Sequence, residues 1–144
     1  MTGVSAGGAE CRALVVEAAR QCVGTRFRPQ GRVIGLGLDC VGVVLIAARA
    51  VGVRLDDVPS YALSGDNSRQ LLCALSRSGC VRLARERGAA GDIAVLLPAP
   101  GQVHLGVLSP KGLVHAHAGL MRVVEGPVDP AWSWLGSWRL REGL

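Results

Sequence analysis

The sequence predicts an α+β fold in which N-terminal helices pack on a C-terminal antiparallel sheet. Two observations carry this prediction. Apolar residues recur at helical spacing before residue 80, and short β-prone runs separated by glycine and proline follow it. Helices first and strands second is the order typical of α+β domains. With 144 residues the chain has the length of one domain, so we expect residues 1–144 to form a single domain.

Three helices are expected. Residues 10–23 carry their apolar side chains on one helical face, and Gly24 can end that helix. Residues 40–51 are almost entirely apolar, as in a buried helix, and Asp39 before them is a candidate N-cap. Residues 66–78 have an amphipathic pattern with an aspartate at the start, which predicts a third helix.

The rest of the chain is expected to form one loop and a sheet. Residues 24–39 contain repeated glycines together with Arg26, Arg28 and Arg32, which predicts a long, irregular and basic loop. The expected strands are residues 81–83, 92–97, 102–108, 112–117, 122–125 and 133–140.

Composition and charge exclude several classes of protein. Sixteen basic residues against 11 acidic ones give a net charge of +5, which suits an anionic partner. Aromatic residues make up only 3% of the chain, and three of the five, Trp132, Trp134 and Trp138, lie together near the carboxyl terminus, so we expect no nucleic-acid partner. The longest apolar run, residues 41–48, is far shorter than the roughly 20 residues of a membrane helix, so no membrane insertion is expected.

The cysteines and the amino terminus indicate a cytoplasmic origin. Five cysteines without a CxxC pair predict free thiols, one of them a candidate nucleophile and four of them core residues. Residues 1–10 lack the basic start and the apolar stretch of an export signal. We therefore expect synthesis in the bacterial cytoplasm without an export signal.

Cys40 is the candidate nucleophile because it is expected at a helix start. The unsatisfied backbone N–H groups there favour a thiolate by about 0.3–1 kcal/mol. The same amides can stabilise an oxyanion during acyl transfer. The alternative is that Cys40 is a small hydrophobic residue of the core.

The three histidines of the chain, His104, His115 and His117, lie within fourteen positions. On a strand His115 and His117 face the same side, and pairing of their strand with the strand of His104 makes two imidazoles neighbours. One ring then accepts the thiol proton and the other orients it. One alternative is that each histidine is an ordinary surface residue or a hydrogen-bonded strand residue. A zinc site with Cys40 is another, but the spacing lacks a recognised ligand pair, so we expect no metal and no cofactor.

Five motifs fall in the order and approximate spacing of a known family. They are GTRF at 24–27, DCVG at 39–42, GDIAVLL at 91–97, VHLGVL at 103–108 and LVHA at 113–116. On these residues the chain resembles the NlpC-type cell-wall cysteine endopeptidases, and it looks most like the small versions encoded with phage tails and gene transfer agents. The resemblance implies a papain-like fold with the nucleophile at a helix N-terminus.

The resemblance also implies roles for the candidate residues. Cys40 would attack the scissile carbonyl of a peptidoglycan stem peptide, His104 would be the general base and His115 would orient it, with a thioester intermediate. Asp39 would bind the free amine of the substrate. The alternative is that Asp39 serves only as the N-cap of the helix.

Two further residues are expected to contact the substrate. His117 would line the site. Arg28 belongs to the basic loop before the nucleophile, which we expect to rim the cleft where carboxylate-rich stem peptides pass.

The chain departs from the family pattern at three positions. Val41 replaces a frequent serine, Phe27 replaces the usual tyrosine, and Arg26 replaces a proline. The changes at Val41 and Phe27 remove hydroxyl groups near the site, while the three residues of the triad, Cys40, His104 and His115, are all present.

The leading hypothesis is a peptidoglycan-degrading cysteine endopeptidase that a phage-like tail carries for local penetration of the cell wall. Its partners would be stem peptides and tail hub or tip proteins, and its location a virion or gene transfer agent tail. The first alternative is a structural tail-tip component with weak or no catalysis, which the cluster of Trp132, Trp134 and Trp138 motivates if these residues form an interface rather than core. A second is an amidase or acyltransferase on a related scaffold.

Overall fold

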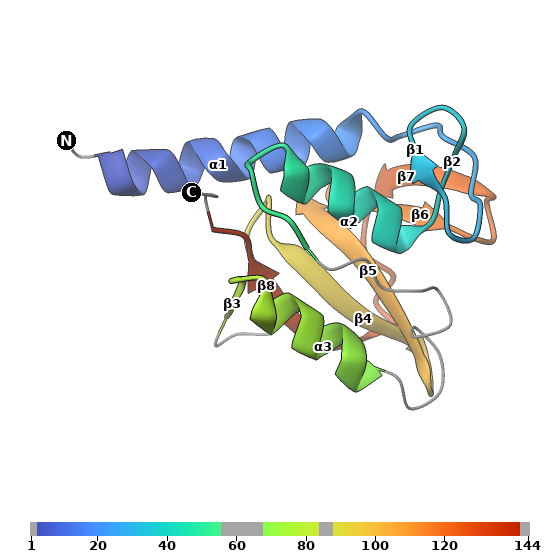
Figure 1. Cartoon of the computed structure of the whole chain (residues 1–144). Helices are drawn as coiled ribbons and strands as arrows, with labels where there is room; N and C mark the ends of the chain where they lie inside the picture. The colour runs from blue at the N-terminus through green and yellow to red at the C-terminus, as the bar shows by residue number, and fades with distance from the viewer. Residues whose placement is uncertain (1–2, 56–67, 84–87, 142–144) are drawn as a thin grey trace.

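The computed structural model describes residues 3–55, 68–83 and 88–141 of the chain. Within these ranges it has three helices and eight strands, and α1 and α2 cross one side of the main sheet (Figure 1). In chain order the elements are α1 (Gly3–Arg20), β1 (Arg32–Val33), β2 (Gly37–Leu38), α2 (Cys40–Arg49), α3 (Ser68–Arg77), β3 (Val81–Arg82), β4 (Ile93–Ala99), β5 (Gln102–Ser109), β6 (Gly112–His117), β7 (Arg122–Gly126) and β8 (Ser133–Arg139).

Six of the strands form one antiparallel sheet in the order β3-β8-β4-β5-β6-β7. The β4–β5 pair extends as far as Ala99 and Gln102, next to the turn that joins the two strands. The β5–β6 pair stays close to its own hairpin and reaches only Val107 and Val114. Beyond that point β5 and β6 separate, and the sheet opens on the side where α2 begins.

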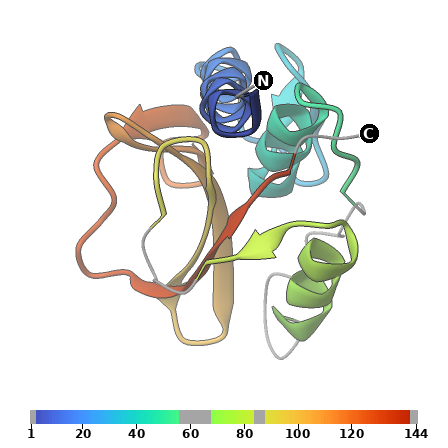
Figure 2. The same cartoon turned by 90° about the vertical axis from the view of Figure 1, so that its left-hand side faces the viewer.

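The core lies between the helices and one face of this sheet. On β4, Ile93 and Val95 face the helices and join the main core, whereas Ala94 and Leu96 join a smaller cluster on the other face. All three helices contribute to the main core, and the β7–β8 connection covers the opposite face (Figure 2). The predicted α+β arrangement of helices on an antiparallel sheet is confirmed.

The three predicted helices are present with shifted ends. α1 begins at Gly3 rather than residue 10, because its first residues are small and carry no apolar period to reveal a helix. Gly24 adopts a φ of +92° just beyond α1, as expected of a stop signal. The predicted cap of α3, Asp66, lies outside the described residues. No described helix is long and apolar enough to cross a membrane.

The expectation of a wholly irregular loop over residues 24–39 was wrong, because the short strands β1 and β2 form an antiparallel hairpin within it. Gly35 turns this hairpin at a φ of +85°, and its N–H donates to the hydroxyl of buried Thr25 over 3.1 Å. The segment is also joined to the sheet edge, since the N–H of Phe27 donates to the carbonyl of Met121 over 2.9 Å. Strands of two residues are too short to show a period in the sequence, which explains the error.

The cysteines are all free thiols, and four of them are buried. Cys73 is the exception to the predicted core role, because it lies on the exposed side of α3. The buried, apolar face of α3 carries Leu71 and Leu75, which are 2% and 3% exposed.

Candidate active site

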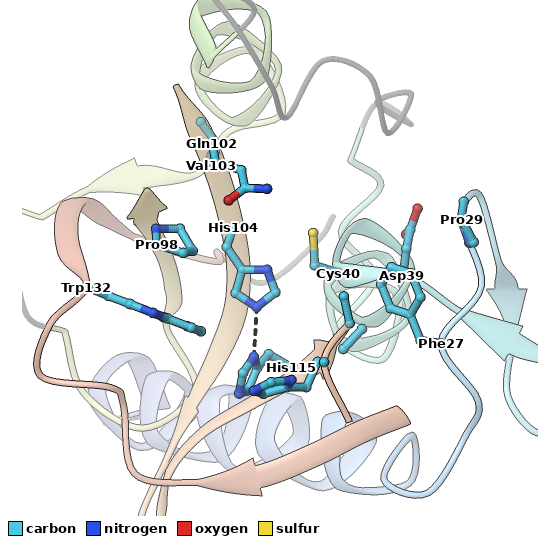
Figure 3. Close-up of a pocket in the computed structure, with 14 residues that line it drawn as sticks. Phe27, Pro29, Asp39, Cys40, Pro98, Gln102, Val103, His104, His115 and Trp132 are labelled. Carbon is cyan, nitrogen blue, oxygen red and sulfur yellow. Dashed lines mark hydrogen bonds between the residues drawn. The ribbon is translucent and has the colours of Figure 1, made fainter. Parts of the chain in front are cut away.

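A pocket of about 380 Å³ opens where β5 and β6 separate and the first turn of α2 meets them. Cys40 lines it from the helix, His104 from β5, and His115 with His117 from β6 (Figure 3). Trp132, from the β7–β8 connection, forms a further wall. The structure therefore gathers the predicted nucleophile and all three histidines around one cavity.

Cys40 is the first residue of α2, and local sequence explains why the helix starts there. Asp39 has an extended backbone, with φ −107° and ψ −175°, and its carboxylate Oδ1 accepts a hydrogen bond from the N–H of Gly42 over 2.9 Å. This is the N-cap geometry that the sequence predicted. Gly42 is required in the first turn because a Cβ there would collide with the backbone carbonyl oxygen of Gly31.

The expected thiolate at Cys40 is not the resting form. Cys40 is only 5% exposed, and this burial raises the pKa of its thiol to about 12. The negative charge of Asp39 raises it as well, whereas backbone amides of Leu105, Val41 and Cys40 itself act in the opposite direction. Desolvation thus outweighs the helix terminus, and the thiol is protonated at neutral pH.

His104 and His115 form the predicted cross-strand pair. Their Nε2 and Nδ1 atoms are 2.7 Å apart, a hydrogen-bond distance. Burial, followed by the neighbouring histidines, lowers the pKa of His104 to about 3 and that of His115 to about 4, so both rings are neutral. If His104 donates from Nε2 to His115, its Nδ1 is left as a proton acceptor.

Cys40 and His104 line the same cavity but are not hydrogen-bonded to each other. In the described part of the chain, no hydrogen bond joins the Cys40 sulfur to either ring nitrogen of His104. The sulfur is nevertheless close to the β5 backbone, because the amide of Leu105, the residue after His104, contributes to its pKa. In Figure 3 the thiol, from α2, and the His104 ring, from β5, are both drawn among the residues that line this pocket. Such contacts commonly tighten only when substrate is bound.

Trp132 is the site residue that sequence reasoning missed. Its ring lies edge-to-face against His104 and His115, with centroid distances of 5.4 and 5.8 Å. The tryptophan cluster was the only signal, and it does not tell the three residues apart. Trp138 is core, at 1% exposed, while Trp134 packs on the smaller cluster behind the sheet.

The two further predicted contact residues have different positions. His117 lines the pocket, with its ring 5.5 Å from that of His115, and its Nδ1 accepts the N–H of Leu120 over 3.1 Å. Arg28 is exposed and does not line the pocket, because its side chain packs over Gly37 of the hairpin. The loop brings Phe27 to the pocket instead.

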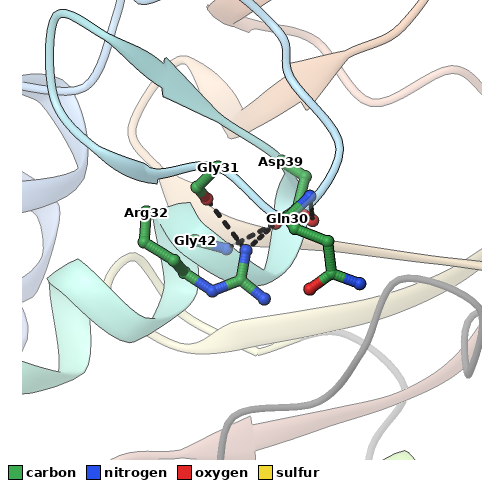
Figure 4. Close-up of polar contacts among 5 residues, drawn as sticks. All are labelled: Gln30, Gly31, Arg32, Asp39 and Gly42. Carbon is green, nitrogen blue, oxygen red and sulfur yellow. Dashed lines mark hydrogen bonds and ion pairs between the residues drawn. The ribbon is translucent and has the colours of Figure 1, made fainter.

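Asp39 is buried and has several partners besides Gly42 (Figure 4). Its Oδ1 lies 2.7 Å from a guanidinium nitrogen of Arg32, and its Oδ2 accepts the N–H of Gln30 over 2.9 Å. The carboxylate therefore anchors the loop before the nucleophile as well as capping α2.

Among the residues that the structure describes, no group of three or more His, Cys, Asp and Glu side chains is placed to hold a metal ion.

Comparison with known proteins establishes the fold of the chain. It is similar to the peptidoglycan hydrolase RipB from Mycobacterium tuberculosis, with a TM-score of 0.66 and 21% identity over 99% of this chain and 72% of RipB. It is similar to the P60 domain of an antigen from M. avium subspecies paratuberculosis, with a TM-score of 0.62 and 19% identity over 93% of this chain and 97% of that domain.

NlpC1 from Trichomonas vaginalis gives a TM-score of 0.67 at 13% identity, over 91% of this chain and 44% of NlpC1, so the chain spans less than half of that protein. No protein-family model matches the sequence, and no curated protein does. The chain therefore has the papain-like α+β fold of the NlpC and P60 cell-wall peptidase domains.

Proposed function

We propose that this chain is a peptidoglycan-degrading cysteine endopeptidase that cleaves stem peptides with Cys40, His104 and His115. The observation that carries the proposal is a pocket that is lined both by Cys40 and by the hydrogen-bonded His104–His115 pair. The fold adds support, because RipB, which shares it, is a peptidoglycan hydrolase.

The first step is attack of the sulfur on the scissile carbonyl carbon. Because Cys40 rests as a thiol and His104 as a neutral imidazole, the proton moves during the attack rather than before it. Nδ1 of His104 takes the proton while Nε2–H stays bound to His115, which holds the ring in this tautomer. Proton transfer by a positioned imidazole contributes about 10²–10⁴-fold to the rate.

The tetrahedral oxyanion needs donors that are already in place. The first backbone N–H groups of α2 have no partner within the helix, and those of Cys40 and Val41 lie near the sulfur. Well-aimed donors of this kind are worth about 2.7–4 kcal/mol each.

The remaining steps return the enzyme to its starting form. The C–N bond breaks, the His104 imidazolium gives its proton to the leaving amine, and an acyl thioester remains on Cys40. Water, activated by neutral His104, then hydrolyses the thioester and restores the thiol.

The setting we propose is a phage-like tail, with tail hub or tip proteins as partners and a virion or gene transfer agent tail as the location. The motif resemblance to the small tail-encoded enzymes supports this setting. We further propose that residues 1–144 act as a single peptidase domain.

A second candidate function is a structural tail component with weak or no catalysis. The buried, protonated thiol at Cys40 favours it, since the resting site holds no preformed nucleophile.

Digestion of purified peptidoglycan distinguishes the two candidates. Wild-type protein is expected to release stem-peptide fragments, identified by liquid chromatography and mass spectrometry, and Cys40→Ala is expected to abolish release at an unchanged thermal midpoint. Cys73→Ala, which removes an exposed thiol on α3, is the matched control and should retain activity. Equal release by Cys40→Ala would refute the mechanism, and no release by folded wild-type protein would favour the structural role.

A further inference from the structure

The ion pair between Arg32 and Asp39 changes the charge of one end of the pocket. Asp39 lines the pocket, and in Figure 3 its carboxylate lies at the end formed by Phe27 and Pro29, with Cys40 between it and His104. Figure 4 shows the Arg32 guanidinium reaching this carboxylate.

Both partners of this pair are largely removed from water. The side chain of Asp39 is 4% exposed and that of Arg32 is 21% exposed. Charges in such surroundings interact more strongly than at a surface, and removing either partner leaves the other charge uncompensated. The carboxylate also accepts the backbone N–H groups of Gln30 and Gly42, so its oxygens already have donors from three residues.

The rest of the pocket offers no second anion. Asp39 is the one acidic side chain among the described residues that line it. His104 and His115 are neutral, and Phe27 and Trp132 present aromatic rings. A substrate ammonium entering beside Asp39 would meet a carboxylate that Arg32 already neutralises, and it would be repelled by the guanidinium.

We propose that Arg32 determines substrate specificity by holding Asp39 in this pair, so that the pocket prefers a peptide with an acylated amine over one with a free ammonium group. The inference rests on the proposed function and identifies its substrate class. An acylated amino terminus is the state of a stem peptide that is still joined to its glycan chain by an amide bond. The enzyme would thus act on the intact wall rather than on fragments that have already been released.

Peptide binding to Cys40→Ala protein tests this preference without relying on turnover. Two stem peptides of identical sequence, one N-acetylated and one with a free amine, are titrated by calorimetry near neutral pH. We expect the acetylated peptide to bind about tenfold more tightly, the scale of one charge-assisted contact. Arg32→Gln should erase or reverse the preference, because the amide can still donate to Asp39 but no longer cancels its charge.

Two further variants separate charge from structure. Arg32→Lys keeps the positive charge and should retain the preference, while Arg49→Gln removes an equivalent charge from the far end of α2 and should leave it unchanged. Tighter or equal binding of the free amine by protein with Arg32, an unaltered preference in Arg32→Gln, or no binding of either peptide would overturn the proposal. Failure of the proposed function is distinct, since it would appear as binding with this preference but no hydrolysis by protein that retains Cys40.

Discussion

His115→Ala is expected to lower kcat by removing the partner that fixes the His104 ring. In the structure His115 Nδ1 lies 2.7 Å from His104 Nε2, and His115 is only 5% exposed, so water does not readily replace it. A buried N–H left without an acceptor costs about 1–3 kcal/mol. The His104 ring can avoid this cost by moving its proton to Nδ1, the nitrogen needed as a base.

The expected size of the effect follows from this tautomer shift. A bias of about 1–3 kcal/mol corresponds to a fall of about 5- to 150-fold in the base-competent form, and kcat should fall by that factor with little change in KM. The loss should stay within the roughly 10²–10⁴-fold that the whole general base supplies.

The assay is the initial rate of stem-peptide hydrolysis over a range of substrate concentrations, with thermal denaturation as a check on folding. His115→Asn is the matched control, because the amide oxygen at the δ position can accept the same hydrogen bond from His104. It should recover most of the lost kcat. An unchanged kcat in folded His115→Ala protein, or equal losses in the two variants, would refute the orienting role.

Three other predictions concern stability and the histidine environment. Because the pKa values of folded His104 and His115 lie below their ordinary value of 6.5, the unfolded chain binds more protons under acid conditions. The free energy of unfolding should then fall between pH 6.5 and 5, by at most about 2 kcal/mol per histidine, and stay flat just above pH 7, as urea denaturation can show. Constant stability across that window would contradict the buried neutral pair. Asp39→Ala should destabilise the fold by about 3–5 kcal/mol in urea, since a buried ion pair and a helix cap are lost together, and Asp39→Asn should lose less because it keeps the cap. Equal losses in the two variants would argue against the cap. Trp132→Ala should admit water and move the pKa values of both histidines toward 6.5 in an NMR titration, whereas Trp134→Ala should not. Unmoved pKa values would show that Trp132 does not shield the pair.

Local patterns explain which parts of the site could be predicted from the sequence. The start of α2 at Cys40 is encoded by one capping aspartate and the apolar run behind it. The shared face of His115 and His117 follows from strand alternation. Pairing of consecutive strands brings β6 next to β5, although the observed pairing ends at Val107 and Val114 and the rings of His104 and His115 meet beyond that point. Each of these inferences depends on residues close together in the chain.

Contacts between distant segments explain what could not be predicted. Trp132 reaches the histidines because the β7–β8 connection folds behind the sheet, and nothing near Trp132 in the sequence indicates that path. The protonated state of Cys40 depends on how deeply the finished fold buries it, which the helix-terminus argument does not measure. Arg32 was expected in a cleft-rimming loop, but the β1–β2 hairpin turns it onto Asp39.

Trapping the acyl group is the most direct test of covalent catalysis by Cys40. Protein and stem peptide are mixed, quenched in acid within the first turnover, digested with pepsin and analysed by mass spectrometry. We predict that the peptide containing Cys40 gains the mass of the acyl fragment, and that hydroxylamine added to the reaction converts this fragment to its hydroxamate. Release of the free acid alone in the presence of hydroxylamine, with Cys40 unmodified throughout, would contradict the thioester mechanism.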